Sequence, residues 1–152
     1  MNVPHCRQER NYSCLPACVR MVLAFYQVEY AEDELRRLFG TRVTGTSPAR
    51  VMLRLPDLGF DAIILDASQS FLRDSVASDQ PCIVHLWTAP LPHWEADVVH
   101  AVVVTDIDEQ IVWINDPVLQ SGPTPVPVDA FLEAWAATDH TLILITPRQS
   151  SL

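Results

Sequence analysis

Cys14 lies where a polar segment of the sequence ends and a segment with regularly spaced apolar residues begins. The apolar residues follow the spacing of one helix face, namely Val19, Val22, Leu23 and Tyr26. A helix packed against a core is therefore predicted from Cys14 onward, with Ser13 as N-cap and Pro16 tolerated in the first turn. A thiol at a helix start loses its proton more easily, because unpaired backbone amides and the helix dipole stabilise an anion there.

Gln8 lies six positions before Cys14 and carries an amide N–H donor that can reach the same helix start. A thiolate with a nearby uncharged donor is half of an acyl-transfer site, since the donor stabilises the oxyanion formed when the thiolate attacks a carbonyl. A buried free cysteine is more often a small hydrophobic residue. The hypothesis therefore requires a base and an orienting acid elsewhere in the chain.

Two runs rich in β-branched residues, 98–106 and 110–115, are separated by a polar turn, which is the pattern of a β-hairpin. With the turn centred on Asp108, position 100 pairs with position 116. Two-residue periodicity then places His100 and Asp116 on a common face, with Cβ atoms about 5 Å apart. A carboxylate beside an imidazole fixes its tautomer and stabilises the imidazolium. Cys14, His100 and Asp116 are thus predicted to form a thiolate–imidazolium–carboxylate set where the helices meet the sheet.

Each of these residues also has a purely structural interpretation. A histidine among valines, as at position 100, is typical of a core histidine, and Asp116 followed by proline is typical of a turn that ends a strand. His85 is a competing base, but no carboxylate is placed opposite it in its predicted strand. His93 is expected to be exposed in a loop.

Composition limits the function classes. The 152 residues fit a single domain, and 49% of them are hydrophobic. The net charge is −9, and the sequence contains arginine but no lysine. An acidic chain with scattered arginines argues against nucleic-acid binding. No apolar run is long enough for a membrane span, and the N-terminal residues lack the apolar region of a secretory signal, so the cytoplasm is the expected location. The cysteine spacings match no usual zinc pattern, and no metal or cofactor is expected.

The order of expected elements predicts an α+β fold, with a helical half over about residues 1–58 and an antiparallel sheet half over about 59–147 of one domain, 1–152. Helices are expected near 14–26, 30–40, 47–55, 68–77 and 128–135, and strands near 60–65, 81–87, 98–106, 110–115 and 141–146. The proline-rich segment 121–127 is expected to be a loop. The loop 88–97 precedes His100 and is expected to line a cleft, with Leu91 and Trp94 as candidates for an apolar substrate subsite.

Three stretches resemble the papain-like cysteine peptidases of the bacteriocin-processing type, the double-glycine leader peptidases. They are the segment from Gln8 to Tyr26, His100 with the valine run after it, and Val-Trp-Ile-Asn before Asp116-Pro117. The resemblance implies a papain-like fold in which Cys14 attacks, His100 acts as base and then acid, Asp116 orients it, and Gln8 donates to the oxyanion.

The sequence also departs from that family. Leu15-Pro16 follows the nucleophile where the family often has glycine, and Gln27 stands where glycine usually follows the end of the helix. The best-known members are fused to membrane transporters with an ATPase domain, so this chain is expected to be a stand-alone relative.

The function predicted from these residues is hydrolysis of a peptide bond, or another amide, through a thioester on Cys14, with a peptide or protein as the partner. Three alternatives remain open. The same thioester can pass to an amine, as in an acyltransferase or a transglutaminase-like enzyme. The chain can instead be a catalytically silent peptide-binding module, or a thiol-redox protein that uses Cys14 and Cys18.

Overall fold

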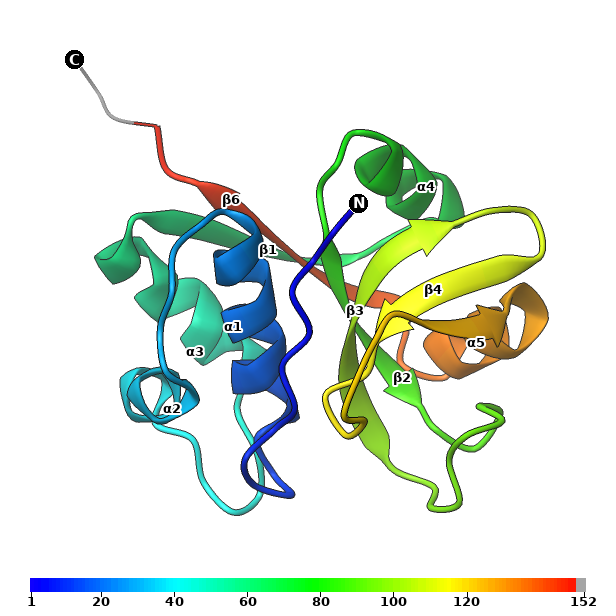
Figure 1. Ribbon diagram of the computed structural model, residues 1–152, viewed down its shortest axis with the longest axis horizontal. Coiled ribbons are helices and arrows are strands. Elements are labelled where there is room, and N and C mark those ends of the chain that lie inside the picture. Colours follow the sequence, from blue (N-terminus) through cyan, green and yellow to red (C-terminus); the bar gives the residue numbers. More distant parts are fainter. Residues whose placement is uncertain (150–152) are drawn as a thin grey trace.

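The computed structural model describes residues 1–149 and contains a twisted six-stranded antiparallel sheet with helices on both faces (Figure 1). The strands lie in the order β1-β6-β2-β3-β4-β5. They are β1 (Phe60–Asp66), β2 (Cys82–Trp87), β3 (Val99–Ile107), β4 (Ile111–Asn115), β5 (Thr124–Pro127) and β6 (Thr141–Pro147). The α-helices are α1 (Cys14–Phe25), α2 (Glu32–Phe39), α3 (Pro48–Arg54), α4 (Gln69–Ala77) and α5 (Val128–Ala136), and a short 3-10 helix, η1 (Leu55–Leu58), follows α3. The predicted α+β class is confirmed.

The sheet separates two hydrophobic cores. Helices α1, α2 and α3 pack on one face of the sheet, and α4 and α5 pack on the other. The two later helices therefore lie on the opposite side of the sheet from the N-terminal helices. Strand β3 serves both cores, because successive side chains of a strand point to opposite faces. Ala101 and Val103 belong to the core under α1, and Val102 and Val104 belong to the core under α4 and α5. In residues 1–149, no helix has the length and apolar character that crossing a bilayer requires.

Strand β5 corrects the prediction that 121–127 is a loop. It pairs with β4, with Trp113 opposite Pro125 and Ile111 opposite Pro127. A proline cannot donate to a ladder, so it is tolerated in strands at a sheet edge. β5 is an edge strand of this sheet, which explains how a proline-rich segment pairs here.

The hairpin of β3 and β4 forms as predicted, but its register differs by two residues. Val103 lies opposite Asn115, so position 116 would lie opposite 102 and not opposite 100, and a bulge interrupts the ladder between Val104 and Asp106. Because side chains alternate with a period of two, a shift of two residues keeps the same face. His100 and Asp116 therefore still lie on one face of the sheet.

The start of α1 is held by a buried carboxylate from α2. Ser13 occupies the N-cap position, but its hydroxyl makes no capping bond and instead donates to Oε1 of Glu32 at 3.1 Å. The same oxygen accepts the backbone N–H of Glu9 at 2.9 Å, and Oε2 pairs with Nε of Arg36 at 3.0 Å. Glu32 is fully buried. It thereby fixes the segment that leads into Cys14, and it leaves the first-turn amides of α1 without a side-chain cap.

Replacing Glu32 with alanine is expected to lower the free energy of unfolding by about 3 kcal/mol, because it breaks a buried ion pair and leaves buried donors unpaired. Asp33→Ala is the matched control, since Asp33 pairs with Arg37 one turn along the same helix but both side chains are more than half exposed. That change is expected to cost less than about 1 kcal/mol. Chemical denaturation measures both, and equal losses would contradict the role given to Glu32.

Candidate active site

Cys14 is the first residue of α1. Helix α1 begins at the end of the molecule where the segment before it and the loop between β2 and β3 also lie (Figure 1). Helix α1 packs against β3, and this contact brings the thiol to the strand that carries His100. The thiol lies close enough to the side chain of His100 and to backbone groups of Leu15 and Ala101 for these groups to lower its pKa. These contacts come from the helix start and from the strand, so the thiol lies where the two elements meet.

His100 and Asp116 are joined by a short hydrogen bond, with Nε2 of His100 2.7 Å from Oδ1 of Asp116. Both side chains are almost completely buried, with exposed fractions of 5% and 0%. An ionised carboxylate only accepts hydrogen bonds, so the proton of this contact is assigned to Nε2. The other ring nitrogen, Nδ1, is left for Cys14. The three residues predicted to form a set are therefore brought together.

The pKa values of the thiol and the imidazole move in opposite directions. Burial alone would raise the pKa of Cys14, but the hydrogen bond and charge of His100 and the backbone groups of Ala101 and Leu15 outweigh it, so the pKa is lowered. Burial alone would lower the pKa of His100, but its bonds to Asp116 and Cys14 and their negative charges raise it to about 9. Both directions favour the thiolate–imidazolium form of the pair over the neutral form.

Asp116 receives four hydrogen bonds. Besides His100, the backbone N–H of Val118 donates to Oδ1 at 3.0 Å, while Nε2 of His93 and Nε1 of Trp94 lie 2.7 Å and 2.9 Å from Oδ2. Burial would raise the pKa of Asp116, but bonds from His100 and His93, the charge of His100 and the Val118 amide hold it well below its usual range. The carboxylate is thus ionised and has its acceptor capacity filled.

The contact of His93 corrects the expectation that this residue is exposed. Its side chain is 19% exposed and faces the carboxylate from the loop before β3. Trp94, predicted as a subsite residue, also points inward, with its ring centroid 4.6 Å from that of His100. The sequence offers one signal for these inward-facing side chains. His93 is a second histidine close to His100, in the loop that leads into β3.

Gln8 is held beside the turn that carries Asp116. Its backbone N–H donates to the carbonyl of Pro117 at 2.7 Å, and its side-chain Nε2 donates to the carbonyl of Arg10 at 2.9 Å. An amide nitrogen has two hydrogens, so one remains for another acceptor. Among residues 1–149, no hydrogen bond joins this side chain to Cys14. A hollow of about 440 Å³ adjoins Gln8 and is lined by Arg7, Gln8, Glu9, Arg10, Asn11 and Val118.

Leu91, a candidate for the substrate subsite, and His85, a candidate base, lie in surroundings that do not suit these roles. Leu91 is 2% exposed and packs in the core under α4 and α5, so we assign its side chain to that core and not to a substrate subsite. His85 lies opposite Ala101 on the neighbouring strand. Burial and the charge of His100 lower its pKa to about 4, which makes it a weak base.

The remaining cysteines differ from Cys14 in their electrostatics. Burial raises the pKa of Cys6, of Cys18 and of Cys82, the last to about 12. All four cysteines are free thiols, and Cys14 is the one whose pKa is lowered. Within residues 1–149, no three histidine, cysteine or acidic side chains are grouped as ligands of one metal ion.

Comparison with known proteins places this arrangement in a family. Residues 2–150 match the profile described as the Peptidase C39 family. The chain is 28% identical over 141 residues to the lactococcin-G-processing and transport ATP-binding protein LagD of Lactococcus lactis subsp. lactis. This match covers 93% of the chain but only 18% of the length of LagD.

Solved structures share the fold. The peptidase domain of Streptococcus ComA, a bi-functional ABC transporter, has a TM-score of 0.79 at 23% identity, with 97% of this chain and 100% of that domain covered. A double glycine motif protease from an AMS/PCAT transporter, solved in complex with the leader peptide, has a TM-score of 0.72 at 22% identity, with 96% and 92% covered. The fold of this chain is therefore the papain-like fold of such peptidase domains.

Proposed function

The chain belongs to the Peptidase C39 family and is a cysteine peptidase, and on that premise we propose that it cleaves a peptide bond through a thioester on Cys14. One observation carries the proposal: the Cys14 thiol lies beside His100, which lowers the pKa of the thiol, and Nε2 of His100 lies 2.7 Å from Oδ1 of the buried Asp116. A nucleophile beside a base that is itself hydrogen-bonded to an orienting acid is the arrangement that acyl transfer requires.

In the proposed reaction the Cys14 thiolate attacks the carbonyl carbon of the scissile bond and forms a tetrahedral oxyanion. The His100 imidazolium then gives a proton to the leaving amine, and the C–N bond breaks to leave a thioester. His100, now neutral, takes a proton from water, and the resulting hydroxide attacks the thioester. The thiolate leaves as the product carboxylate forms. Asp116 keeps the Nε2–H of His100 fixed throughout, so that Nδ1 faces the reacting atoms.

The oxyanion is proposed to be stabilised by the side chain of Gln8 and the backbone N–H of Cys14. Two features support this assignment. The Ser13 hydroxyl is bound to Glu32 and does not cap the first-turn amides. Gln8 is held beside the turn after β4 by its bond to Pro117 and retains a free side-chain hydrogen. Preorganised donors of this kind act on charge that develops in the transition state.

Gln8→Ala is expected to lower kcat about 100- to 1,000-fold, since one oxyanion donor is lost. Alkylation of Cys14 by iodoacetamide should stay within about twofold of wild type, because the thiolate–imidazolium pair is untouched. Gln110→Ala, which removes an exposed amide in the turn between β3 and β4, is the control for kcat. An unchanged kcat in Gln8→Ala would remove this residue from the oxyanion site.

We propose peptides with two glycines before the scissile bond as the substrate class. The double glycine motif protease of similar fold and the processing function in the name of LagD support this choice. The Trp94 ring packed on His100 also favours residues without a side chain next to the scissile bond. Trp94 and the hollow beside Gln8 are the proposed walls for the flanking residues. The chain covers 18% of LagD, so transport is not part of the proposal.

The test is incubation with a peptide library, read by mass spectrometry, using wild-type protein and the same protein alkylated with iodoacetamide. We expect cleavage after Gly-Gly by the untreated protein alone. Added hydroxylamine separates the two fates of the thioester, because capture as a hydroxamate in place of the free acid shows that amines compete with water. Equal cleavage by both preparations would contradict the proposal. A thiol nucleophile works in a reducing compartment, which supports the cytoplasm as the proposed location.

A further inference from the structure

The loop between β2 and β3, residues 88–98, provides two of the four hydrogen bonds that Asp116 accepts. His93 and Trp94 both lie on Oδ2, at 2.7 Å and 2.9 Å. His100 and the Val118 amide both lie on Oδ1, at 2.7 Å and 3.0 Å. The two carboxylate oxygens therefore have separate sets of partners, and one set comes entirely from this loop.

We propose that His93 is a positioning residue, whose Nε2–H holds Oδ2 of Asp116 so that Oδ1 remains directed at His100. This inference rests on the proposed function only where it assigns the thiolate–imidazolium pair to peptide hydrolysis. His93 does not touch the thiol or the substrate in this account. It acts through the carboxylate, which it prevents from turning about its own Cβ–Cγ bond.

The loop is built to keep His93 in place. The Thr88 backbone N–H donates to the carbonyl of Val98, and the Val98 N–H donates to the Thr88 hydroxyl, each at 2.9 Å, so the two ends of the loop are fastened together. Leu91 is buried in the core and anchors the middle of the loop. A donor on a fastened loop loses little conformational freedom when it binds, which is what a positioning role requires.

The chemistry needs a donor at this place and not a positive charge. A carboxylate only accepts, so His93 meets it with a proton on Nε2. A glutamine amide nitrogen reaches about as far along the side chain as Nε2 of histidine, whereas that of asparagine is one bond shorter.

The test compares His93→Gln with His93→Asn, two polar amides that differ by one methylene. The first readout is the rate at which iodoacetamide alkylates Cys14 at pH 6, followed by mass spectrometry of the peptide that contains it. We expect His93→Asn to react about tenfold more slowly than wild type, by analogy with the loss of a residue that orients a metal-bound histidine, and His93→Gln to stay within about twofold. The second readout is turnover of a fluorogenic peptide amide ending in Gly-Gly, where kcat should fall in His93→Asn with KM changed less than about threefold.

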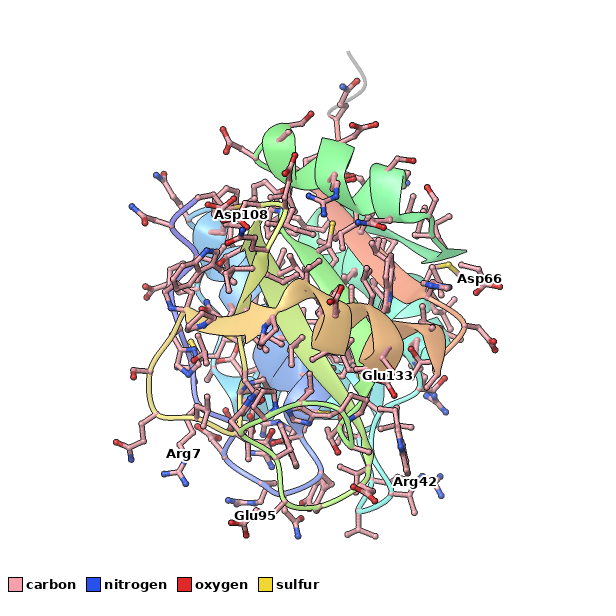
Figure 2. The ribbon with its side chains drawn as sticks, turned by 90° about the vertical axis from the view of Figure 1, so that its right-hand side faces the viewer. Arg7, Arg42, Asp66, Glu95, Asp108 and Glu133 are labelled. Carbon is pink, nitrogen blue, oxygen red and sulfur yellow. The ribbon has the colours of Figure 1, made fainter. Side chains whose placement is uncertain are left out.

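Glu95→Gln is the control within the same loop, since Glu95 is exposed. Its side chain lies at the lower edge of the molecule in Figure 2. A wild-type alkylation rate in His93→Asn would overturn the proposal, and so would an equal loss in both histidine variants. The alkylation readout needs no substrate. If wild-type protein fails to cleave the peptide, the proposed hydrolysis fails while the comparison of the two variants still decides the role of His93.

Discussion

Replacing Cys14 with alanine is expected to lower kcat for peptide hydrolysis by about a million-fold, which is the scale found when a serine protease loses its nucleophile. The thioester cannot form without the sulfur, so the loss appears in kcat and is not rescued by more substrate. The measurement is steady-state turnover of the Gly-Gly peptide amide, with protein concentration fixed by absorbance.

The fold should survive this change. Cys14 is the first residue of α1 and its side chain is only partly buried, and alanine is the best helix former. Cys6→Ala is the matched control, because Cys6 is also a partly exposed thiol but burial raises its pKa. Its kcat should stay within about twofold of wild type. Turnover by Cys14→Ala at even a hundredth of the wild-type rate would contradict a covalent mechanism at this sulfur.

His100→Ala is expected to cause a loss of similar size in kcat, because the nucleophile and its base act as a unit. The leaving amine loses its proton donor, and Cys14 loses the contact that lowers its pKa. Alkylation at pH 6 should therefore slow as well. The double variant Cys14→Ala/His100→Ala should be no worse than either single variant, since each already removes the whole unit.

The same variant separates catalysis from the alternative that His100 is a core histidine. Its removal leaves Asp116 with three donors, from Val118, His93 and Trp94, so the expected cost in unfolding free energy is only about 1–3 kcal/mol. Global unfolding seen by circular dichroism would instead support a structural role. His140→Asn is the control, because asparagine tolerates the positive φ of 55° that His140 adopts.

The sequence was sufficient to predict the residues whose positions follow from periodicity. The two-residue repeat of a hairpin predicts that His100 and Asp116 lie on one face, and they do so although the observed register differs from the predicted one by two residues. A register wrong by one would have put them on opposite faces. Cys14 was placed at a helix start by the apolar spacing after it, and the helix begins at that residue.

The side chains that the sequence did not predict lie where no repeat fixes their direction. His93 and Trp94 belong to an irregular loop, so no repeat in the sequence indicates the direction of their side chains. The structure shows that both turn inward to Asp116. Ser13 has the composition of a cap, yet its hydroxyl binds Glu32, a contact between residues 19 positions apart that local spacing does not reveal. Long-range polar contacts of this kind depend on how helices pack, which pattern alone does not specify.

The departure from the family pattern after the nucleophile has a local explanation. Leu15 is buried in the core under α1, and Pro16 is buried in the first turn, where its missing N–H has no intrahelical partner. The backbone of Leu15 is among the groups that lower the pKa of Cys14. Leucine and proline at these positions therefore fit the helix start without displacing the thiol.

The central claim is that the Cys14 thiolate and the His100 imidazolium form an ion pair. An NMR titration of the His100 imidazole in wild type and in Cys14→Ala tests it most directly. In wild type the imidazolium should persist until the pH rises to about 9, because Asp116 and the thiolate both stabilise its charge. In Cys14→Ala the pKa should fall, since the hydrogen bond and charge of the thiolate are gone. A His100 imidazole that titrates near the ordinary value of about 6.5 in both proteins would contradict the account.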